Sequence, residues 1–292
     1  MTMPRLPNEW DPTRTTLQAY SQALTAFPRA AGVADDRWTH VAMTIVSNGL
    51  VAKEVPLSDG LGMVTTIDLV KHEILIEAGS DVERIDLLDG PSVSSVGASV
   101  LGFAERHGPA IEADADRFSG TDTLVYVPEH AEVFLAAAKY VDAAFRLMNT
   151  SLTGEVTGPH LWPHGFDIAT EWFSPVRVPS GDGDASAQIA VGWYPADDGY
   201  FYANPWPFTE AWSDEPVIEG STWHLENWQG AVVDADGIER SHIVAFGLAP
   251  YVADDPAQAG AQELDPPPHP LELLGVGVAP GHQRGALGGV TT

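Results

Sequence analysis

The stretch of sequence that decides the fold is residues 38–55, WTHVAMTIVSNGLVAKEV. Two β-type runs, 38–46 and 50–55, lie on either side of Asn48-Gly49, a pair that favours the tight turn of a β-hairpin. Strands joined by so short a turn are antiparallel, because neighbouring parallel strands need a long crossover connection. The sequence therefore predicts an antiparallel sheet that begins near Trp38.

Further strands and helices surround this hairpin. Residues 63–70 and 73–77 are strand-like, with Lys71-His72 at the turn between them. Three segments carry apolar residues at helical spacing and predict amphipathic helices that pack against a core. They lie at 17–27, where Pro28 is expected to end the helix, at 93–103, and at 128–148. Helices and hairpins in separate runs are typical of an α+β fold.

The texture of the chain changes after the third predicted helix. Residues 158–233 alternate in the manner of strands, and seven of the nine tryptophans lie between residues 162 and 228. We therefore predict an α+β fold with antiparallel sheets in two lobes and about three amphipathic helices. Residues 1–252 are expected to form a single domain, with lobes at about 1–152 and 153–252. Residues 253–292 are rich in Pro and Gly and are expected to form a poorly ordered tail.

The composition restricts the classes of function. Fourteen Lys and Arg residues against 41 Asp and Glu residues give a net charge of −27, which repels nucleic-acid backbones and anionic lipid headgroups. The absence of cysteine excludes disulfides, thiolate nucleophiles and cysteine-ligated metals. No segment resembles a secretory signal or a membrane span, so a cytoplasmic protein is expected, without nucleic-acid or membrane partners.

The first candidate site is residues 160–173, HLWPHGFDIATEWF. His164 and Asp167 suggest a general base or metal ligand with an orienting carboxylate, and a divalent metal ion is one open alternative. From residue 165 the alternation predicts a strand with Asp167 and Glu171 on one face. These two carboxylates would lie about 13 Å apart along the strand, too far for one metal ion. Pro163 opposes a helix that would bring His160 and His164 together.

Two later segments carry the remaining candidate residues. His224 and Glu226 lie within residues 223–231, WHLENWQGA, and suggest an acid–base pair. Aromatic rings with hydrogen-bonding groups suit a pocket for a small ring or sugar. The candidate ligand-binding residues are Trp162, Tyr202, Asn204, Trp206 and Trp228.

The blocks at 161–167 (Leu-Trp-Pro-His-x-Phe-Asp) and 223–231 (Trp-His-x-Glu-x-Trp-x-Gly-Ala) resemble those of an uncharacterised bacterial domain-of-unknown-function family. The resemblance extends over about residues 10–250. It implies no established activity, cofactor or catalytic residue. It favours His164 and Asp167 over His160, and it implies a closing helix where the chain instead has its Pro-rich tail.

Two functions follow as expectations. The first is a small-molecule-binding protein that uses His and carboxylate groups in an aromatic-walled pocket, with acid–base or metal-assisted catalysis left open. The alternative is a non-catalytic interaction or scaffold protein, whose Trp and Tyr residues form a core or an interface. Convergence of His164, Asp167, His224 and Glu226 around a concavity would favour the first. The sequence leaves the ligand, the reaction and the oligomeric state open.

Overall fold

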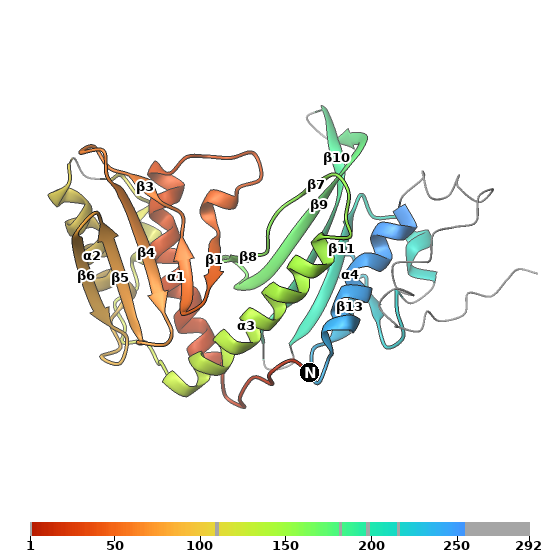
Figure 1. Cartoon of the computed structure of the whole chain (residues 1–292), viewed down its shortest axis with the longest axis horizontal. Coiled ribbons are helices and arrows are strands. Elements are labelled where there is room, and N and C mark those ends of the chain that lie inside the picture. The colour runs from red at the N-terminus through yellow and green to blue at the C-terminus, as the bar shows by residue number, and fades with distance from the viewer. Residues whose placement is uncertain (1, 109–110, 181–182, 197–198, 215–216, 255–292) are drawn as a thin grey trace, which may run out of the picture.

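A computed structural model describes residues 2–108, 111–180, 183–196, 199–214 and 217–254 (Figure 1). The tail predicted at 253–292 lies outside these residues from position 255 onward. The helices are α1 (Asp11–Ala31), α2 (Val93–Arg106), α3 (Pro128–Asn149) and α4 (Arg240–Asp254). The strands are β1 (Met43–Val46), β2 (Gly49–Ala52), β3 (Val55–Pro56), β4 (Gly62–Asp68), β5 (Glu73–Ala78), β6 (Asp81–Asp86), β7 (Glu155–Val156), β8 (His160–Trp162), β9 (Asp167–Ser180), β10 (Gly183–Tyr194), β11 (Tyr200–Trp206), β12 (Thr222–His224) and β13 (Gly230–Asp234).

The strands form one antiparallel sheet, which confirms the α+β class. Its order is β12-β13-β11-β10-β9-β8-β1-β2-β4-β5-β6, with β3 paired to β4 and β7 paired to β9. The two predicted sheet-forming regions are joined where β1 meets β8, through the single residue pair Met43–Leu161. Figure 1 shows the two halves of this sheet inclined to each other. The predicted hairpin is present, but its two turn residues are Ser47 and Asn48, because Gly49 already belongs to β2 opposite Val46.

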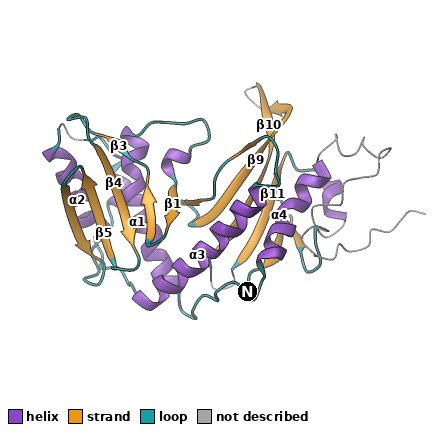
Figure 2. Ribbon diagram, in the orientation of Figure 1, coloured by secondary structure: helices purple, strands orange, loops and turns teal. Residues whose placement is uncertain are grey.

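Buried residues of α1–α4 form one core cluster with one face of the sheet. Figure 2 shows α1 and α2 with the half of the sheet that contains β4 and β5, and α3 and α4 with the half that contains β9 and β11. Helix α1 contacts β2 and β3 with α2 beside it, whereas α3 contacts β9 and α4 contacts β10 and β11. Directly paired residues of antiparallel strands point to the same face. The buried Met43–Leu161 pair therefore continues the helix-packed face across the junction, and both residues belong to one large core cluster.

In the part of the chain that the structure describes, none of α1–α4 packs on the opposite face of β8–β11, which presents polar residues. Along β9, Ile168 and Trp172 belong to the helix-packed core, so Asp167, Ala169 and Glu171 point the other way. A small cluster of Val41 and Ala42 with Trp162 and Ala169 covers part of this face. We call this side of β8–β11, opposite the helices, the open face of the sheet.

The structure corrects the first predicted strand, because residues 38–42 do not belong to a strand and β1 begins at Met43. Thr39–Val41 form a single 3-10 turn, and Trp38 has a left-handed backbone with φ of 59°. The cause is Asp35, whose carboxylate accepts hydrogen bonds from the backbone N–H groups of Arg37, Thr39 and His40. Such local side-chain bonds offer the backbone an alternative to a strand ladder.

The helices differ from the prediction in two respects. Pro28 does not end α1, which continues to Ala31. Because Pro28 lies in the last turn, its missing N–H costs only one hydrogen bond, and its carbonyl still accepts from the N–H of Gly32. Helix α4 was not predicted, and it buries Ile243 and Phe246 against the core. In the described part of the chain, no helix has the length and apolar character needed to cross a membrane.

His107, at the C-terminal end of α2, contacts one carboxylate in the connection between β3 and β4 and another at the start of β6. Its Nδ1 lies 2.8 Å from Asp59 Oδ2, and its Nε2 lies 3.1 Å from Asp81 Oδ2. Hydrogen bonds that the His107 ring donates to Asp59 and Asp81 raise the pKa of His107 above its usual value. A raised folded-state pKa gives stability that is fully present below the unfolded pKa and is lost as pH rises through the folded pKa.

We therefore expect His107→Gln to lower the melting temperature at mildly acidic pH. The difference from the wild type should shrink as the pH is raised past the pKa of folded His107. Melting curves of both proteins across this pH range test the prediction. A difference that stays constant with pH would show that packing, and not the charge of His107, carries the contribution.

Candidate functional site

A cleft of about 370 Å³ lies on the open face of the sheet. Its aromatic walls are Trp162 from β8, Phe173 from β9, Tyr202 from β11 and Trp38 from the segment after α1. The two alanines that line it, Ala169 on β9 and Ala190 on β10, leave its base open because their side chains are small. Segments from both halves of the chain therefore build one cavity with polar groups inside aromatic walls, the usual character of a small-molecule site.

The polar centre of the cleft is a pair formed by Asp167 and Tyr202. Tyr202 donates its hydroxyl to Asp167 Oδ2, from β11 across β10 to β9. Gly192 on β10 makes this reach possible, since it is paired with Ala169 on one side and Tyr202 on the other. A Cβ atom at Gly192 would collide with the Tyr202 ring. The absence of a side chain at Gly192 therefore allows the ring to lie across the strand.

Gly165 makes room for the same carboxylate from the other side. A Cβ atom there would lie 2.6 Å from Asp167 Oδ1, closer than atoms in contact allow. The loop between β8 and β9 is held by α1, where Gln18 and Gln22 donate to the backbone carbonyls of His164 and Pro163. The position of Asp167 is thus set by a glycine on each side and by a loop fixed to a helix.

Burial shifts the titration of the groups in the cleft. It raises the pKa of Asp167, and the hydrogen bond from Tyr202 and the charge of His164 oppose this shift. Burial also raises the pKa of Glu171, with Arg37 opposing and Asp167 adding to the shift. The pKa of Tyr202 is raised by burial and by Asp167. Carboxyl groups with raised pKa values hold a proton closer to neutral pH and suit proton exchange with a ligand.

The rim of the cleft carries an engaged arginine and an exposed tryptophan. Arg37 donates to both carboxylate oxygens of Glu155, at 2.8 and 2.5 Å, and its guanidinium lies 3.5 Å from the centroid of Phe173. Trp38 is 57% exposed and stacks on His40 with the ring centroids 5.5 Å apart. The charge of Arg37 is therefore largely satisfied by Glu155, whereas the ring of Trp38 is exposed although His40 stacks on it and the Arg29 guanidinium lies 5.7 Å from its centroid.

The structure places four of the predicted site residues in this cleft, namely Trp162, His164, Asp167 and Tyr202. His224 and Trp228 line a neighbouring hollow of about 430 Å³ instead. The ring of His224 stacks on Trp228 at 4.4 Å, and its Nδ1 lies 3.0 Å from the Trp228 carbonyl oxygen. His224 is thus bound within its own loop.

The other predicted residues lie outside the cleft. Glu226 is exposed in the loop after β12. Asn204 donates to the carbonyl oxygen of Gln229. Trp206 follows Asn204 by two residues and lies on the same face of β11. It lines neither the cleft at Asp167 nor the hollow at His224. The four predicted polar residues therefore do not form one cluster, and only His164 and Asp167 share the cleft.

A metal ion at His164 and Asp167 stays a prediction. Among the described residues, no group of three or more His, Asp or Glu side chains is arranged to hold a metal ion. His164 and Asp167 thus have no third ligand of these types in that part of the chain.

Several residues of the cleft were not predicted as site residues. Gln188 and Ala190 on β10 are the partners of Phe173 and Glu171 on β9, so they point to the open face as well. The alternation of β9 could have drawn attention to Glu171. Arg37 and Trp38 carry no local signal, because they reach the cleft through the turn that Asp35 organises.

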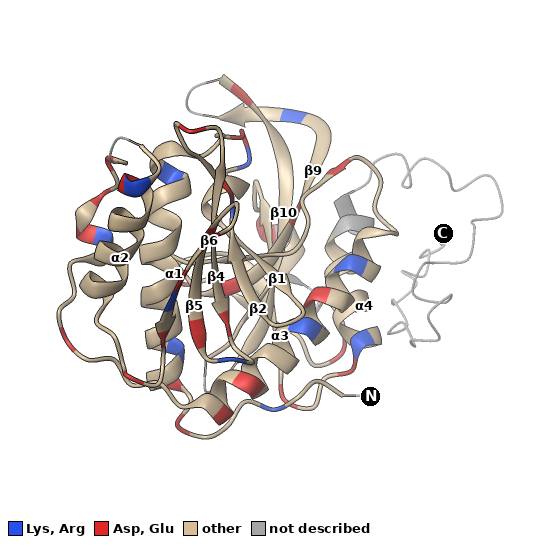
Figure 3. Cartoon of the chain, turned by 60° about the vertical axis from the view of Figure 1, so that its left-hand side comes forward, with Lys and Arg blue, Asp and Glu red and all other residues tan. Residues whose placement is uncertain are grey.

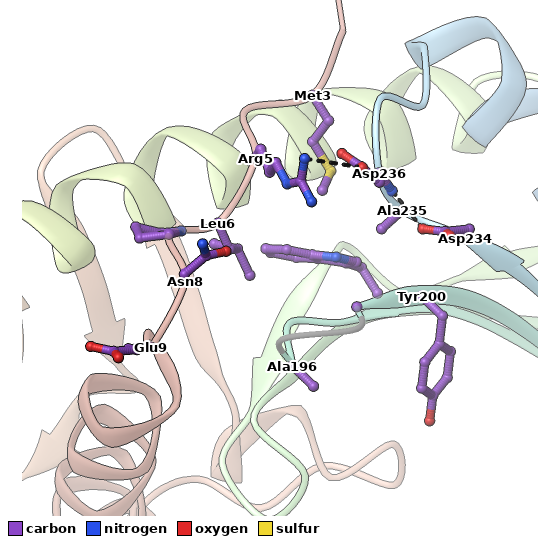
Figure 4. A pocket seen from close by; sticks show the side chains of 13 residues that line it. Met3, Arg5, Leu6, Asn8, Glu9, Ala196, Tyr200, Asp234, Ala235 and Asp236 are labelled. Atoms are coloured by element: carbon purple, nitrogen blue, oxygen red, sulfur yellow. Dashed lines mark hydrogen bonds and ion pairs between the residues drawn. The ribbon is translucent and has the colours of Figure 1, made fainter.

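A larger hollow, of about 590 Å³, lies between the N-terminal segment and the ends of β10, β11 and β13 (Figure 4). Two of its charged groups, Arg5 and Asp236, bond to each other at 3.4 Å and are both more than half exposed. None of the predicted site residues lines it. The cleft at Asp167 is the better candidate because desolvation there raises the pKa values of two carboxyl groups, Asp167 and Glu171.

Comparison with known proteins agrees with the resemblance noted in the sequence. The model of a Family of unknown function (DUF5996) matches residues 3–242. The chain belongs to this family. The family description assigns no activity, as the resemblance implied. Neither a curated protein nor a solved structure matches the chain significantly. The function of this DUF5996 protein therefore has to be argued from its own geometry.

Proposed function

We propose that the protein binds a small organic molecule in the cleft at Asp167 and Tyr202. The observation that carries the proposal is the half-buried Asp167–Tyr202 pair, built across Gly192 inside aromatic walls. A carboxyl group withdrawn from water costs free energy, and such groups cluster at functional sites. Asp167 would exchange a proton with the ligand or hold it by a hydrogen bond, and His164 would assist from the rim.

The dimensions and the charge of the cleft support a small ligand over a macromolecule. A volume of about 370 Å³ falls within the usual range for small-molecule pockets. The net charge of −27 opposes nucleic acid. The interaction-protein alternative has its support in Trp38, whose exposed ring at the rim would also suit a protein surface.

Filling the cleft tests the proposal. Ala190→Leu adds a branched side chain to its lining, and Ala98→Leu makes the same change at an exposed position of α2. We expect a ligand-observed NMR screen of a fragment library to find compounds that bind the wild type and Ala98→Leu. Their affinity for Ala190→Leu should be at least about tenfold weaker, because the added methyl groups occupy the site.

The opposite outcome is informative as well. A fragment set that binds Ala190→Leu as well as the wild type would place ligand binding elsewhere and leave the interaction-protein alternative.

Plasma mass spectrometry of the purified protein separates the two chemical forms of the proposal, metal-assisted and acid–base. A stoichiometric metal that is lost in His164→Ala supports metal assistance, and a metal-free protein supports the acid–base form.

A further inference from the structure

We propose that the ligand of the cleft is a linear aliphatic diamine or polyamine, with one ammonium group at Asp167 and another at Glu171. This inference rests on the proposed function, because it names the class of molecule that the same cleft would take. It follows from the spacing of the two carboxyl groups, from the surface between them and from the charges that surround them.

The first step is the geometry of β9. Asp167 and Glu171 lie on the open face four residues apart, which separates their Cα atoms by about 13 Å along the strand. Ala169 lies between them on the same face, and Ala190 is the partner of Glu171 on β10. Ala169 is covered by Val41, Ala42, Trp162 and Tyr202, so the surface between the two carboxyl groups is apolar. A methylene chain fits such a surface, whereas a compact polar ligand would leave part of it without a partner.

The second step is the balance of charge within the cleft. Asp36, Asp167 and Glu171 are acidic, and the neighbouring basic groups are His164 and Arg37. Arg37 is engaged with both carboxylate oxygens of Glu155, so its charge is only partly available to Glu171. A carboxylate removed from water is costly unless a cation or hydrogen bonds accompany it. A molecule with one ammonium group could accompany only one of Asp167 and Glu171, whereas a diamine accompanies both.

The third step is the character of the walls. Trp162 and Tyr202 stand at the Asp167 end of the cleft, since Trp162 is the strand partner of Asp167 and Tyr202 bonds to it. Phe173 lies two residues beyond Glu171 on the same face. Aromatic faces attract ammonium groups and also cover methylene chains. Each end of the cleft therefore has a carboxyl group and an aromatic ring, but Arg37 already lies over Phe173, so that ring serves the methylene chain and only the Asp167 end has rings for an ammonium group.

The charge of the whole protein acts in the same direction. Acidic residues are spread over strands, helices and loops (Figure 3), and the net charge is −27. Such a field raises the local concentration of cations and the rate at which they bind. It also attracts polyamines without specificity, so the experiment has to separate binding in the cleft from attraction to the surface.

Isothermal titration calorimetry with diaminobutane, diaminohexane, diaminooctane and spermidine tests the inference, with hexylamine as the monoamine control. We expect at least one of the diamines or spermidine to bind with one-to-one stoichiometry and at least about tenfold more tightly than hexylamine, a difference of about 1.4 kcal/mol. Asp167→Asn and Glu171→Gln should each reduce its affinity to the level of hexylamine. Glu105→Gln removes one exposed charge from α2 and should leave the affinity unchanged.

Asp167→Asn and Glu171→Gln should both fold, because neither removes a charge that stabilises the folded protein. Burial raises the pKa of Asp167 and of Glu171, so each ionised group costs stability above its folded pKa. The melting temperatures of Asp167→Asn and Glu171→Gln at neutral pH should therefore be no lower than that of the wild type. If one variant is misfolded, the other still decides the result.

The outcomes separate the inference from the proposed function. Diamine and spermidine affinities no greater than that of hexylamine, or losses in Glu105→Gln as large as those in Glu171→Gln, would overturn the inference. If no amine binds while fragments sensitive to Ala190→Leu are found, the inference is wrong and the proposed function stands. If neither amines nor such fragments bind, both are wrong.

Discussion

Replacing Gly192 by alanine should destabilise the protein by about 2 kcal/mol, the usual cost of overpacking a buried site. The new methyl group would collide with the Tyr202 ring, which lies across this position. If the ring moves away, Tyr202 loses its hydrogen bond to Asp167. Both groups are largely withdrawn from water, and an unsatisfied buried polar group costs about 1–3 kcal/mol. Urea unfolding of the wild type and the variant measures the difference.

A second glycine of the same chain supplies the control. Gly102 lies inside α2, and a Cβ atom there would meet no atom within 4 Å. Gly102→Ala should therefore stabilise the protein by roughly 0.5–1 kcal/mol, since alanine is the better helix former. In a Tyr202→Leu background, Gly192→Ala should cost less than in the wild type, because the ring is gone. An equal cost in both backgrounds would show that Gly192 is needed for another reason.

The sequence predicts those parts of the fold that local patterns encode. The hairpin near Asn48 and the alternation along β9 depend on neighbouring residues only, and the structure has both, although the hairpin turns at Ser47-Asn48, one residue before the predicted pair. The first predicted strand fails at residues 38–42 because the Asp35 side chain bonds to the backbone there. Hydrophobic periodicity carries no information about such a bond. Helix α4 was missed because its buried side is flanked by apolar residues and Pro250, so its amphipathic pattern is weak.

The candidate site shows the same division between local and distant information. His164 and Asp167 were predicted because they lie close together in the sequence, and both line the cleft. Tyr202 was predicted from its own strand, but its bond to Asp167 depends on Gly192, a residue with no chemistry of its own. His224 and Glu226 look equivalent to His164 and Asp167 in sequence. The structure separates them because His224 stacks on Trp228 within its loop and Glu226 is exposed.

His160 is expected to make the protein lose stability as the pH falls from about 6.5 to about 4. Burial lowers the pKa of His160 from 6.5 to about 4, with smaller effects from the charges of Lys53 and Arg146. Within this interval the unfolded chain binds a proton at His160 and the folded protein does not, so stability decreases with decreasing pH. The shift corresponds to roughly 3 kcal/mol when it is complete. The Nδ1 atom of His160 is buried without a hydrogen-bond partner among the described residues, so only the charges of Asp35 and Asp142 favour the charged ring, and burial outweighs them.

His160→Gln should remove this component because glutamine does not titrate. Urea unfolding at a series of pH values between 7 and 4 should show the wild type losing roughly 3 kcal/mol more than the variant. His242→Gln changes an exposed histidine of α4 and should lose as much as the wild type, since the carboxylates that titrate in this range are common to all three proteins. Parallel curves for the wild type and His160→Gln would mean that the folded protein accommodates the imidazolium. The ring would then have to gain water or a carboxylate partner on protonation, because the charged form cannot remain buried alone.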